Sequence, residues 1–474
     1  MTGIRLVERH ARTNRDANKL QLEDRAFHGW YRFVLSYPPH LVRDYLQRFE
    51  ILPGQVVLDP FCGTGTTIVE CKKRGVHGIG IEANPMAAFA SRVKVDWSPD
   101  PAALLAHAQG VFEDASAELL RDGIEDQPAL VSTDAAPTHL KALLPAQHEM
   151  LLEGSISPLP LHKALVLLEC LDRNRDDRFH AHELLALGTA LVTTSSNLHF
   201  GPEVGVSAPK SDAPVLDPWF RGVREIAGDL QTPRTAALAE ATVHPADARR
   251  PEQVLAPESV DCVITSPPYP NEKDYTRTTR LESVLLGLIK DRDDLRRLKQ
   301  GLIRSNTRNV YKADSDDDFV SHHAGIQTIA AAIEARRLEL GKTSGFEKMY
   351  SRVARLYFGG MARHLAGLRQ ALKPGARLAY VVGDQASYLR VMIRTGQLLA
   401  ELAAELGYEV IGIDLFRTRL ATATREELRE EVVVLRWPGP SGAKRSSDPI
   451  GLPNASARIR ERWRDITGWL PRTN

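Results

Sequence analysis

The stretch that decides the fold runs from Val260 to Tyr269 and reads Val-Asp-Cys-Val-Ile-Thr-Ser-Pro-Pro-Tyr. Its apolar, β-branched first part predicts a buried strand of a parallel sheet. The two prolines end this strand, because neither has the N–H that a ladder requires, and they stiffen a turn at its carboxyl end. Open α/β sheets place their ligands at that end. The hydroxyl, carbonyls and aromatic ring of this turn suit a flat heterocycle with an exocyclic amine. A rigid loop or a proline-rich docking motif is the alternative interpretation.

A glycine-rich turn follows an earlier predicted strand, Val56–Asp59, and reads Pro-Phe-Cys-Gly-Thr-Gly-Thr-Thr over residues 60–67. Its glycines let the backbone pass close to a ligand, and the two threonines open a helix. A further strand, Gly78–Glu82, ends in an acid about twenty residues after the turn, which is the spacing for an acid that reaches ribose hydroxyls. The turn has neither a Walker lysine nor the Gly-x-Gly-x-x-Gly pattern, so a phosphate cradle is not favoured.

Together, these two motifs resemble those of S-adenosylmethionine-dependent amino-methyltransferases. Residues 59–67 resemble the first motif of that family, and Ser-Pro-Pro-Tyr at 266–269 resembles its catalytic fourth motif. The form that begins with Ser is typical of DNA cytosine-N4 methyltransferases, whereas adenine-N6 enzymes more often begin with Asp or Asn. The resemblance implies in-line methyl transfer to the N4 amine of cytosine in DNA after base flipping. Adenine-N6 methylation, RNA base methylation and a non-catalytic DNA-binding subunit are the alternatives.

The same resemblance assigns roles to individual residues. The Ser266 hydroxyl and the Pro267 carbonyl would accept protons of the target amine, Pro268 completes the turn, and Tyr269 would stack on the extruded base. S-adenosyl-L-methionine is the implied cofactor and no metal is required. Its methionine end would be flanked by Tyr37, Pro38, Asp59, Pro60, Phe61, Gly63, Gly65 and Thr66, its ribose by Glu82 and its adenine by Asp247.

The predicted fold is a Rossmann-like class I methyltransferase α/β sheet with an antiparallel edge hairpin and an inserted helical subdomain. The hairpin strands are expected at Tyr408–Phe416 and Glu430–Trp437. The insertion shows no clear strand, and residues 1–20 are expected to form a mobile arm or a helix. The predicted parts are 1–98 (arm and cofactor-binding half), 99–242 (helical insertion, a candidate for target recognition), 243–437 (catalytic half, with a basic helical insertion around 285–345) and 438–474 (linker and tail).

Two stretches of the insertion have open interpretations. Asp172–Glu183 mimics an EF-hand loop, but Asp177 stands where the sharp turn requires glycine, so a polar turn between helices is favoured over a calcium site. Asn197–Gly205 is rich in turn-forming residues and carries an aromatic side chain. It is either a DNA-contacting loop or a connector.

The charge of the chain neither favours nor excludes nucleic acid, because the net charge is only +1 over 474 residues. Any DNA-binding surface must therefore be local, and Arg277, Arg280, Arg304 and Arg308 are the predicted phosphate contacts, with a solvated helix face as the alternative. The expected partner is double-stranded DNA, with a separate cognate restriction endonuclease as a further candidate. No apolar run long enough for a membrane span or signal peptide is present, and the four cysteines lack metal-ligand spacing, so a reduced cytoplasmic protein is expected.

Overall fold

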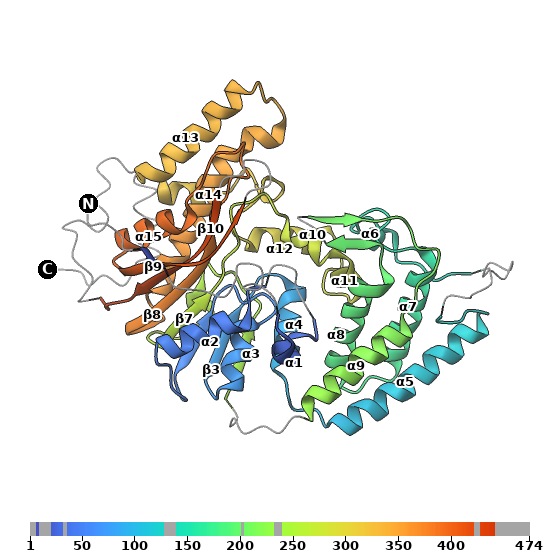
Figure 1. Cartoon of the computed structure of the whole chain (residues 1–474). Coiled ribbons are helices and arrows are strands. Elements are labelled where there is room, and N and C mark those ends of the chain that lie inside the picture. The colour runs from blue at the N-terminus through green and yellow to red at the C-terminus, as the bar shows by residue number, and fades with distance from the viewer. Residues whose placement is uncertain are drawn as a thin grey trace.

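A single large β-sheet runs through the computed structural model, which describes residues 6–8, 20–31, 36–127, 139–200, 203–231, 239–420 and 427–440 (Figure 1). Most neighbouring strands are parallel; β10 alone runs antiparallel to its two neighbours in the described sheet. The strands lie in the order β1 (Leu6–Glu8), β9 (Glu409–Leu420), β10 (Glu427–Arg436), β8 (Leu372–Gly383), β7 (Val260–Thr265), β2 (Val56–Asp59), β3 (His77–Ile81) and β6 (Ala241–His244). The Rossmann-like sheet predicted from the sequence is therefore confirmed.

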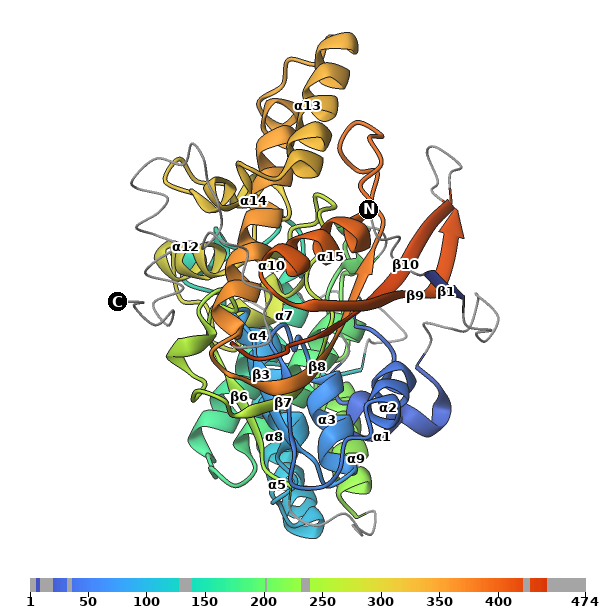
Figure 2. The ribbon, with the colours of Figure 1, turned by 90° about the vertical axis from the view of Figure 1, so that its left-hand side faces the viewer.

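Helices cover both faces of this sheet, because its central strands are apolar on both sides (Figure 2). On one face, Val57 and Ile264 pack against α2 (Pro39–Arg48) and α3 (Thr66–Lys73). On the other face, Leu58 and Val263 pack with α14 (Gly345–Leu368) and α15 (Thr395–Glu405). Consecutive residues of a strand therefore pack against the helices on opposite faces of the sheet.

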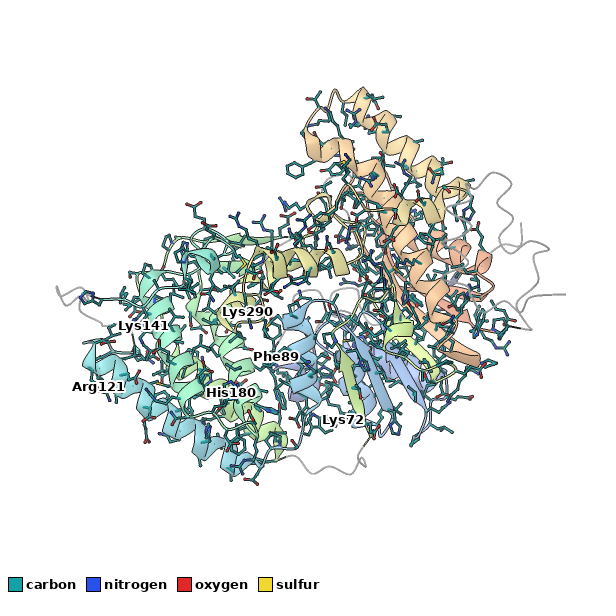
Figure 3. All side chains as sticks on the ribbon, turned by 180° about the vertical axis from the view of Figure 1, so that it is seen from behind. Lys72, Phe89, Arg121, Lys141, His180 and Lys290 are labelled. Atoms are coloured by element: carbon teal, nitrogen blue, oxygen red, sulfur yellow. The ribbon has the colours of Figure 1, made fainter. Side chains whose placement is uncertain are left out.

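A helical lobe lies beside the sheet, on the side of α4 (Pro85–Val95), and side chains fill its interior (Figures 1 and 3). The expectation that residues 99–242 contain no strand is wrong at two places. Leu198–Phe200 (β4) and Val204–Val206 (β5) form a separate antiparallel pair, and β6 already begins at Ala241. The lobe is built from α5 (Pro101–Arg121), α6 (Pro145–His148), α7 (Pro158–Arg173), α8 (His180–Ala190), a π-helical turn at Leu191–Ser195 and α9 (Leu216–Leu230).

The segment after the catalytic turn forms short helices and then a projecting helical pair. In Figure 2, α13 (Ala324–Glu339) and the first half of α14 extend away from the sheet together. Between them and β7 lie α10 (Tyr275–Thr278), α11 (Arg280–Leu285), α12 (Arg292–Gly301) and 3-10 turns at Thr307–Asn309 and Asp316–Val320. The last of these turns packs very closely on α14, since a Cβ at Gly359 would lie 1.8 Å from the Asp316 carbonyl oxygen.

The two ends of the described chain meet at one side of the sheet. β9 and β10 form the predicted antiparallel hairpin. The hairpin does not end the sheet, because β1 pairs in parallel with β9, whereas an arm or a helix was expected there. Short elements Leu22–Asp24, α1 (Arg25–His28) and Pro251–Gln253 complete the described secondary structure, and the predicted tail beyond residue 440 lies outside the described residues. Within the described ranges, none of the helices has the length and apolarity needed to cross a bilayer.

Candidate active site

The glycine-rich turn and the Ser-Pro-Pro-Tyr turn line one cavity of about 580 Å³. They meet because β2 and β7 are adjacent parallel strands, so both turns leave the same edge of the sheet. The predicted site residues on the wall of this cavity are Tyr37, Pro60, Phe61, Gly63, Thr66, Glu82, Asp247, Ser266, Pro267, Pro268 and Tyr269.

Three predicted cofactor residues do not line that cavity. Asp59 is fully buried beneath it, where its carboxylate accepts hydrogen bonds from the Tyr37 hydroxyl (2.8 Å) and the Thr265 hydroxyl (2.6 Å). Burial raises the pKa of Asp59, and these hydrogen bonds oppose the shift. Gly65 has φ of 86° and faces α4, where an added Cβ would lie 2.4 Å from the Ser91 hydroxyl oxygen. Asp59 and Gly65 therefore support the glycine-rich turn from inside the protein and do not face the cavity.

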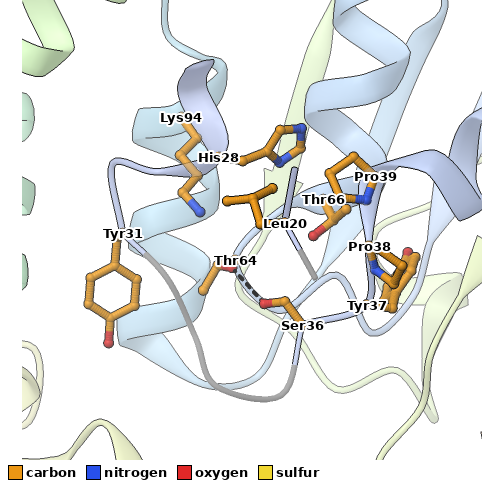
Figure 4. A pocket seen from close by; sticks show the side chains of 10 residues that line it. All are labelled: Leu20, His28, Tyr31, Ser36, Tyr37, Pro38, Pro39, Thr64, Thr66 and Lys94. Carbon is orange, nitrogen blue, oxygen red and sulfur yellow. Dashed lines mark hydrogen bonds between the residues drawn. The ribbon is translucent and has the colours of Figure 1, made fainter. Parts of the chain in front are cut away.

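The third, Pro38, lines a smaller cavity of about 30 Å³ on the other side of the glycine-rich turn (Figure 4). Thr64, Thr66 and Lys94 also line it, and the Ser36 and Thr64 hydroxyls are 3.4 Å apart across it. Tyr37 and Thr66 belong to the walls of both cavities. The predicted contact of Pro38 with the cofactor stays a prediction.

Glu82 stands just past the end of β3 and is held by backbone amides. Gly63 N–H donates to one carboxylate oxygen at 2.9 Å and Asn84 N–H to the other at 2.7 Å. Burial raises the pKa of Glu82 to about 7, and these amide hydrogen bonds act in the opposite direction. The carboxylate is thus fixed in position and close to half-ionised at neutral pH.

Asp247 is held by a residue whose role the sequence did not reveal. Arg249 forms a bidentate pair with it (2.9 and 2.7 Å) and also bonds Asp316 at 2.6 Å. Because Arg249 is buried, its positive charge needs compensation, which the carboxylates of Asp247 and Asp316 provide. The sequence shows an arginine two residues after Asp247 but gives no sign that distant Asp316 completes the cluster. The structure makes Asp316 an indirect support of Asp247 on the cavity wall.

The side chains of Ser266 and Tyr269 both contact β8, and the Tyr269 N–H also donates to the Tyr275 hydroxyl at 3.3 Å. The Ser266 hydroxyl donates its proton to the Val381 carbonyl at 3.1 Å, which leaves its lone pairs as acceptors. The Tyr269 ring lies against Gly383, where an added Cβ would stand 3.0 Å from the ring. A side chain at position 383 would therefore displace the ring from its place beside the cavity.

Charged side chains at the base of the edge hairpin complete the cavity and were not predicted. Arg417 forms a bidentate pair with Glu430 (2.6 and 2.8 Å), and both line the cavity with Lys273 and Arg419. Arg417 and Glu430 face each other at a register shift between β9 and β10. Because the hairpin lies far along the chain from both turns, no motif near either turn could identify them.

The structure corrects two of the four predicted DNA contacts. Arg304 is 2% exposed, and Asp314 accepts two hydrogen bonds from its guanidinium at 2.8 Å each. Arg280 is also buried and bonds the carbonyl oxygens of Thr276 and Met150. Both guanidinium groups are engaged inside the protein and are not available to phosphate. Arg277 is half-buried and Arg308 is exposed.

The EF-hand-like stretch forms the loop between α7 and α8, beside His180 at the start of α8 (Figure 3). Its Asp176 carboxylate is occupied by Arg178, and its Glu183 carboxylate is bonded to His107 at 2.7 Å. No cluster of three or more potential metal-ligating side chains occurs within the described ranges. The geometry is that of a polar connection between two helices.

Comparison with known proteins agrees with the two motifs. The family N6_N4_Mtase, described as "DNA methylase", matches residues 10–90. The Type II methyltransferase M.BsoBI of Geobacillus stearothermophilus is 24% identical, over 91% of this chain and 89% of that protein. The Type II methyltransferase M.AvaI of Nostoc sp. is 24% identical, over 86% of each chain. These matches support a DNA amino-methyltransferase.

Two further matches are weaker, one because it covers little of the chain and the other because its structural likeness is low. The Type II methyltransferase M.MjaII of Methanocaldococcus jannaschii is 36% identical over 69 residues, which is 14% of this chain and 13% of that protein. The crystal structure of TrmN from Thermus thermophilus is matched with a TM-score of 0.28 and 12% identity, over 87% of this chain and 52% of that one. That likeness is too low to bear on the fold, which rests on the strand order itself.

Methyltransferases of the matched kind use S-adenosyl-L-methionine, and the cavity of this chain fits that cofactor. A Cβ built at Gly63 would meet nothing within 4 Å, so the peptide of the glycine-rich turn is open to a ligand. Glu82 and Asp247 supply carboxylate oxygens on the same wall. A carboxylate suits ribose hydroxyls and an exocyclic amine, both of which donate hydrogen bonds. The cofactor supplies a methyl group on a sulfonium, which needs no metal activation.

Proposed function

We propose that the protein transfers a methyl group from S-adenosylmethionine to the N4 amine of cytosine in double-stranded DNA. The observation that carries this proposal is the orientation of Ser266. Its hydroxyl donates a hydrogen bond to the Val381 carbonyl. The lone pairs of its oxygen can therefore accept an N–H of the target amine beside the Pro267 carbonyl. The resemblance of Ser-Pro-Pro-Tyr to cytosine-N4 enzymes supports cytosine over adenine.

The residues of this turn would act by making a poor nucleophile better. An amine conjugated to a ring donates its lone pair into that ring. Hydrogen bonds from its protons to Ser266 and Pro267 localise that pair on nitrogen and stabilise the positive charge that develops there. In-line attack forms the N–CH₃ bond as the S–CH₃ bond breaks, and the extra proton on nitrogen leaves to water.

The base must leave the duplex to reach this turn. Tyr269 lines the cavity and is held against Gly383, so its ring offers a fixed surface on which an extruded base can stack. Tyr37, Phe61, Gly63, Glu82 and Asp247 would hold the cofactor on the opposite wall. Positioning of the two reactants would then supply most of the rate enhancement.

The relatives are named as Type II methyltransferases. We infer that this protein likewise marks DNA in a restriction–modification system beside a separate endonuclease. Methylation that protects DNA from cleavage by one such endonuclease would support this role.

The decisive experiment incubates the purified protein with unmethylated duplex DNA and methyl-labelled S-adenosylmethionine, and then separates the digested nucleosides. We expect label in N4-methylcytosine. Label in N6-methyladenine would overturn the choice of base, and label only in RNA substrates would overturn the choice of nucleic acid. A Ser266→Ala variant should lose most of the activity while it binds the cofactor normally.

A further inference from the structure

The β4–β5 pair differs from every other described strand, because it is not part of the main sheet. Its two strands face each other as Leu198 with Val206, His199 with Gly205 and Phe200 with Val204. Alternation along a strand therefore gives the ribbon two unlike faces. One carries four apolar residues, and the other carries His199 opposite a glycine.

The apolar face is directed at the protein. Val204 is buried and Leu198 packs against the core of the helical lobe, whereas Val206, at the end of β5, is 38% exposed. The opposite face, which we call the outer face (His199, Gly205 and Ser207), is open to solvent at His199 and Ser207. In Figure 1 the ribbon is the pair of green arrows between α6 and the segment that carries α10 and α12.

The imidazole on the outer face is held in one position. A Cβ at residue 205 would lie 2.4 Å from His199 Cε1 and 2.7 Å from its Nε2, so the ring lies flat over the glycine. The Ser207 hydroxyl is 3.2 Å from Nδ1. With this hydroxyl donating to Nδ1, the neutral ring carries its proton on Nε2, which makes no hydrogen bond to any described residue. An exposed side chain is thus fixed with a free donor.

The base of the ribbon is anchored firmly to the lobe. Asn197 is 1% exposed and its side chain donates to the Gly154 carbonyl (2.8 Å) and the Ser157 hydroxyl (3.1 Å). Its carbonyl accepts from Ser207 N–H at 2.7 Å, and its side-chain oxygen accepts from Lys210 N–H at 3.0 Å. This anchoring makes the ribbon a rigid platform rather than a loose connector.

The ribbon is connected through the helical lobe to the segment that lines the cavity. Lys273 lines the cavity four residues after Tyr269. Burial lowers the pKa of Lys273, and the nearby charge of Arg419 lowers that pKa further. The carboxylates of Glu203 and Glu430 oppose the shift.

The ribbon lies against Gly154, where an added Cβ would stand 3.6 Å from Val206, and nearby Met150 accepts a hydrogen bond from Arg280 at 3.2 Å. Arg280 begins α11, directly after α10, whose first residue Tyr275 lines the cavity. We take the ribbon to stand beside the segment over which a duplex must lie for one base to enter.

We propose that the outer face of the β4–β5 ribbon reads the target sequence, with His199 donating from Nε2 to a base edge in the major groove of duplex DNA. This inference rests on the proposed function. Guanine O6 and N7, adenine N7 and thymine O4 are acceptors in that groove, and a donor fixed in one position favours the base pairs that place an acceptor opposite it. The ribbon, rather than the basic segment at 285–345, is the element that carries specificity.

The test compares the DNA sequences that wild-type protein and variants methylate in a plasmid library of randomised duplex segments. We expect His199→Ala to accept additional bases at one position of the recognition sequence and to lower kcat/KM on the wild-type sequence about tenfold or more. Gly205→Ala, which keeps the imidazole but pushes it aside, should relax the same position. His148→Ala is the matched control, because His148 is an exposed histidine of the same lobe.

Cofactor affinity and thermal unfolding, measured on each variant, separate a local effect from misfolding. Unchanged specificity and rate in both the His199→Ala and Gly205→Ala variants would overturn the inference while wild-type activity upholds the proposed function. An equal effect from His148→Ala would also overturn it. Absence of any DNA methylation by the wild-type protein would overturn the proposed function itself.

Discussion

The two walls of the central cavity are built in different ways. On the cofactor wall, Glu82 is held by two backbone amides within about twenty residues of chain, whereas Asp247 is supported through Arg249 by distant Asp316. On the base wall, Ser266 and Tyr269 contact Val381 and Gly383 of β8, and the Tyr275 hydroxyl accepts a hydrogen bond from the Tyr269 N–H. Contacts between residues close in sequence therefore build much of the cofactor wall. The base wall forms only when β8 packs beside the Ser-Pro-Pro-Tyr turn.

This difference predicts that damage to the base wall stops transfer without releasing the cofactor. Tyr269→Ala should lower kcat by about 100-fold or more, because the extruded base loses the surface that aligns it with the methyl group. The dissociation constant for S-adenosylmethionine should change by less than about twofold. Single-turnover kinetics and calorimetry measure the two quantities. Tyr269→Phe keeps the ring and is the control; equal loss of cofactor binding in Tyr269→Ala would break the distinction between the walls.

Damage to the cofactor wall should have the opposite signature. Glu82→Ala should weaken cofactor binding by about 10- to 100-fold, as expected for loss of charge-assisted hydrogen bonds. Burial raises the pKa of Glu82 to about 7, so the acceptor-only carboxylate dominates above pH 7 and is lost as the pH falls below it. Affinity should thus be lower at pH 6 than at pH 8. Glu82→Gln should bind weakly with little dependence on pH, and a wild-type affinity that is flat over this range would contradict the assignment.

The support of Asp247 from α14 gives a smaller effect, on stability. Gly359→Ala should lower the free energy of unfolding by about 1–3 kcal/mol, because the new methyl group overlaps the Asp316 carbonyl. Gly110→Ala is the matched control, since Gly110 is exposed in the middle of α5 and an added Cβ there meets nothing within 4 Å. That variant should gain about 0.5–1 kcal/mol. Denaturant unfolding measures both; equal stability of the two variants would show that the segment at Asp316 is free to move.

The smallest expected effect concerns DNA binding outside the two walls. Arg308→Ala should weaken binding to all duplexes alike and reduce the slope of log K against log salt by about one. Arg308 is exposed, whereas Arg304 is buried against Asp314. Arg304→Ala should therefore destabilise the fold rather than alter the salt slope. Fluorescence anisotropy over a salt series distinguishes these outcomes, and an unchanged slope in the Arg308→Ala variant would remove that residue from the DNA surface.

Much of the fold and of the candidate site was predictable from the sequence. Strands at Val56–Asp59 and Val260–Thr265 were recognisable because buried parallel strands are apolar throughout and are followed here by turn residues. Since parallel neighbours place their carboxyl ends together, the two turns were expected to share a site, and they line one cavity. The helical character of residues 99–242 was also predicted, but the β4–β5 ribbon was not, because three-residue strands carry too little periodicity to recognise.

By itself, the sequence determined which residues are the candidates for the chemistry: the glycine-rich turn, Glu82 and Ser-Pro-Pro-Tyr are contiguous motifs whose spacing along the chain reflects local backbone geometry. Only the tertiary structure decided which charged residues are free to act. Each of three arginines forms an ion pair inside the protein: Arg249 with Asp247, Arg304 with Asp314, and Arg417 with Glu430 at the cavity. Composition marks all three as ordinary surface arginines. Separation along the chain does not reveal their partners, because Arg249 pairs with nearby Asp247 and also with distant Asp316. A charge that leaves water must be matched by the acids that the fold brings beside it.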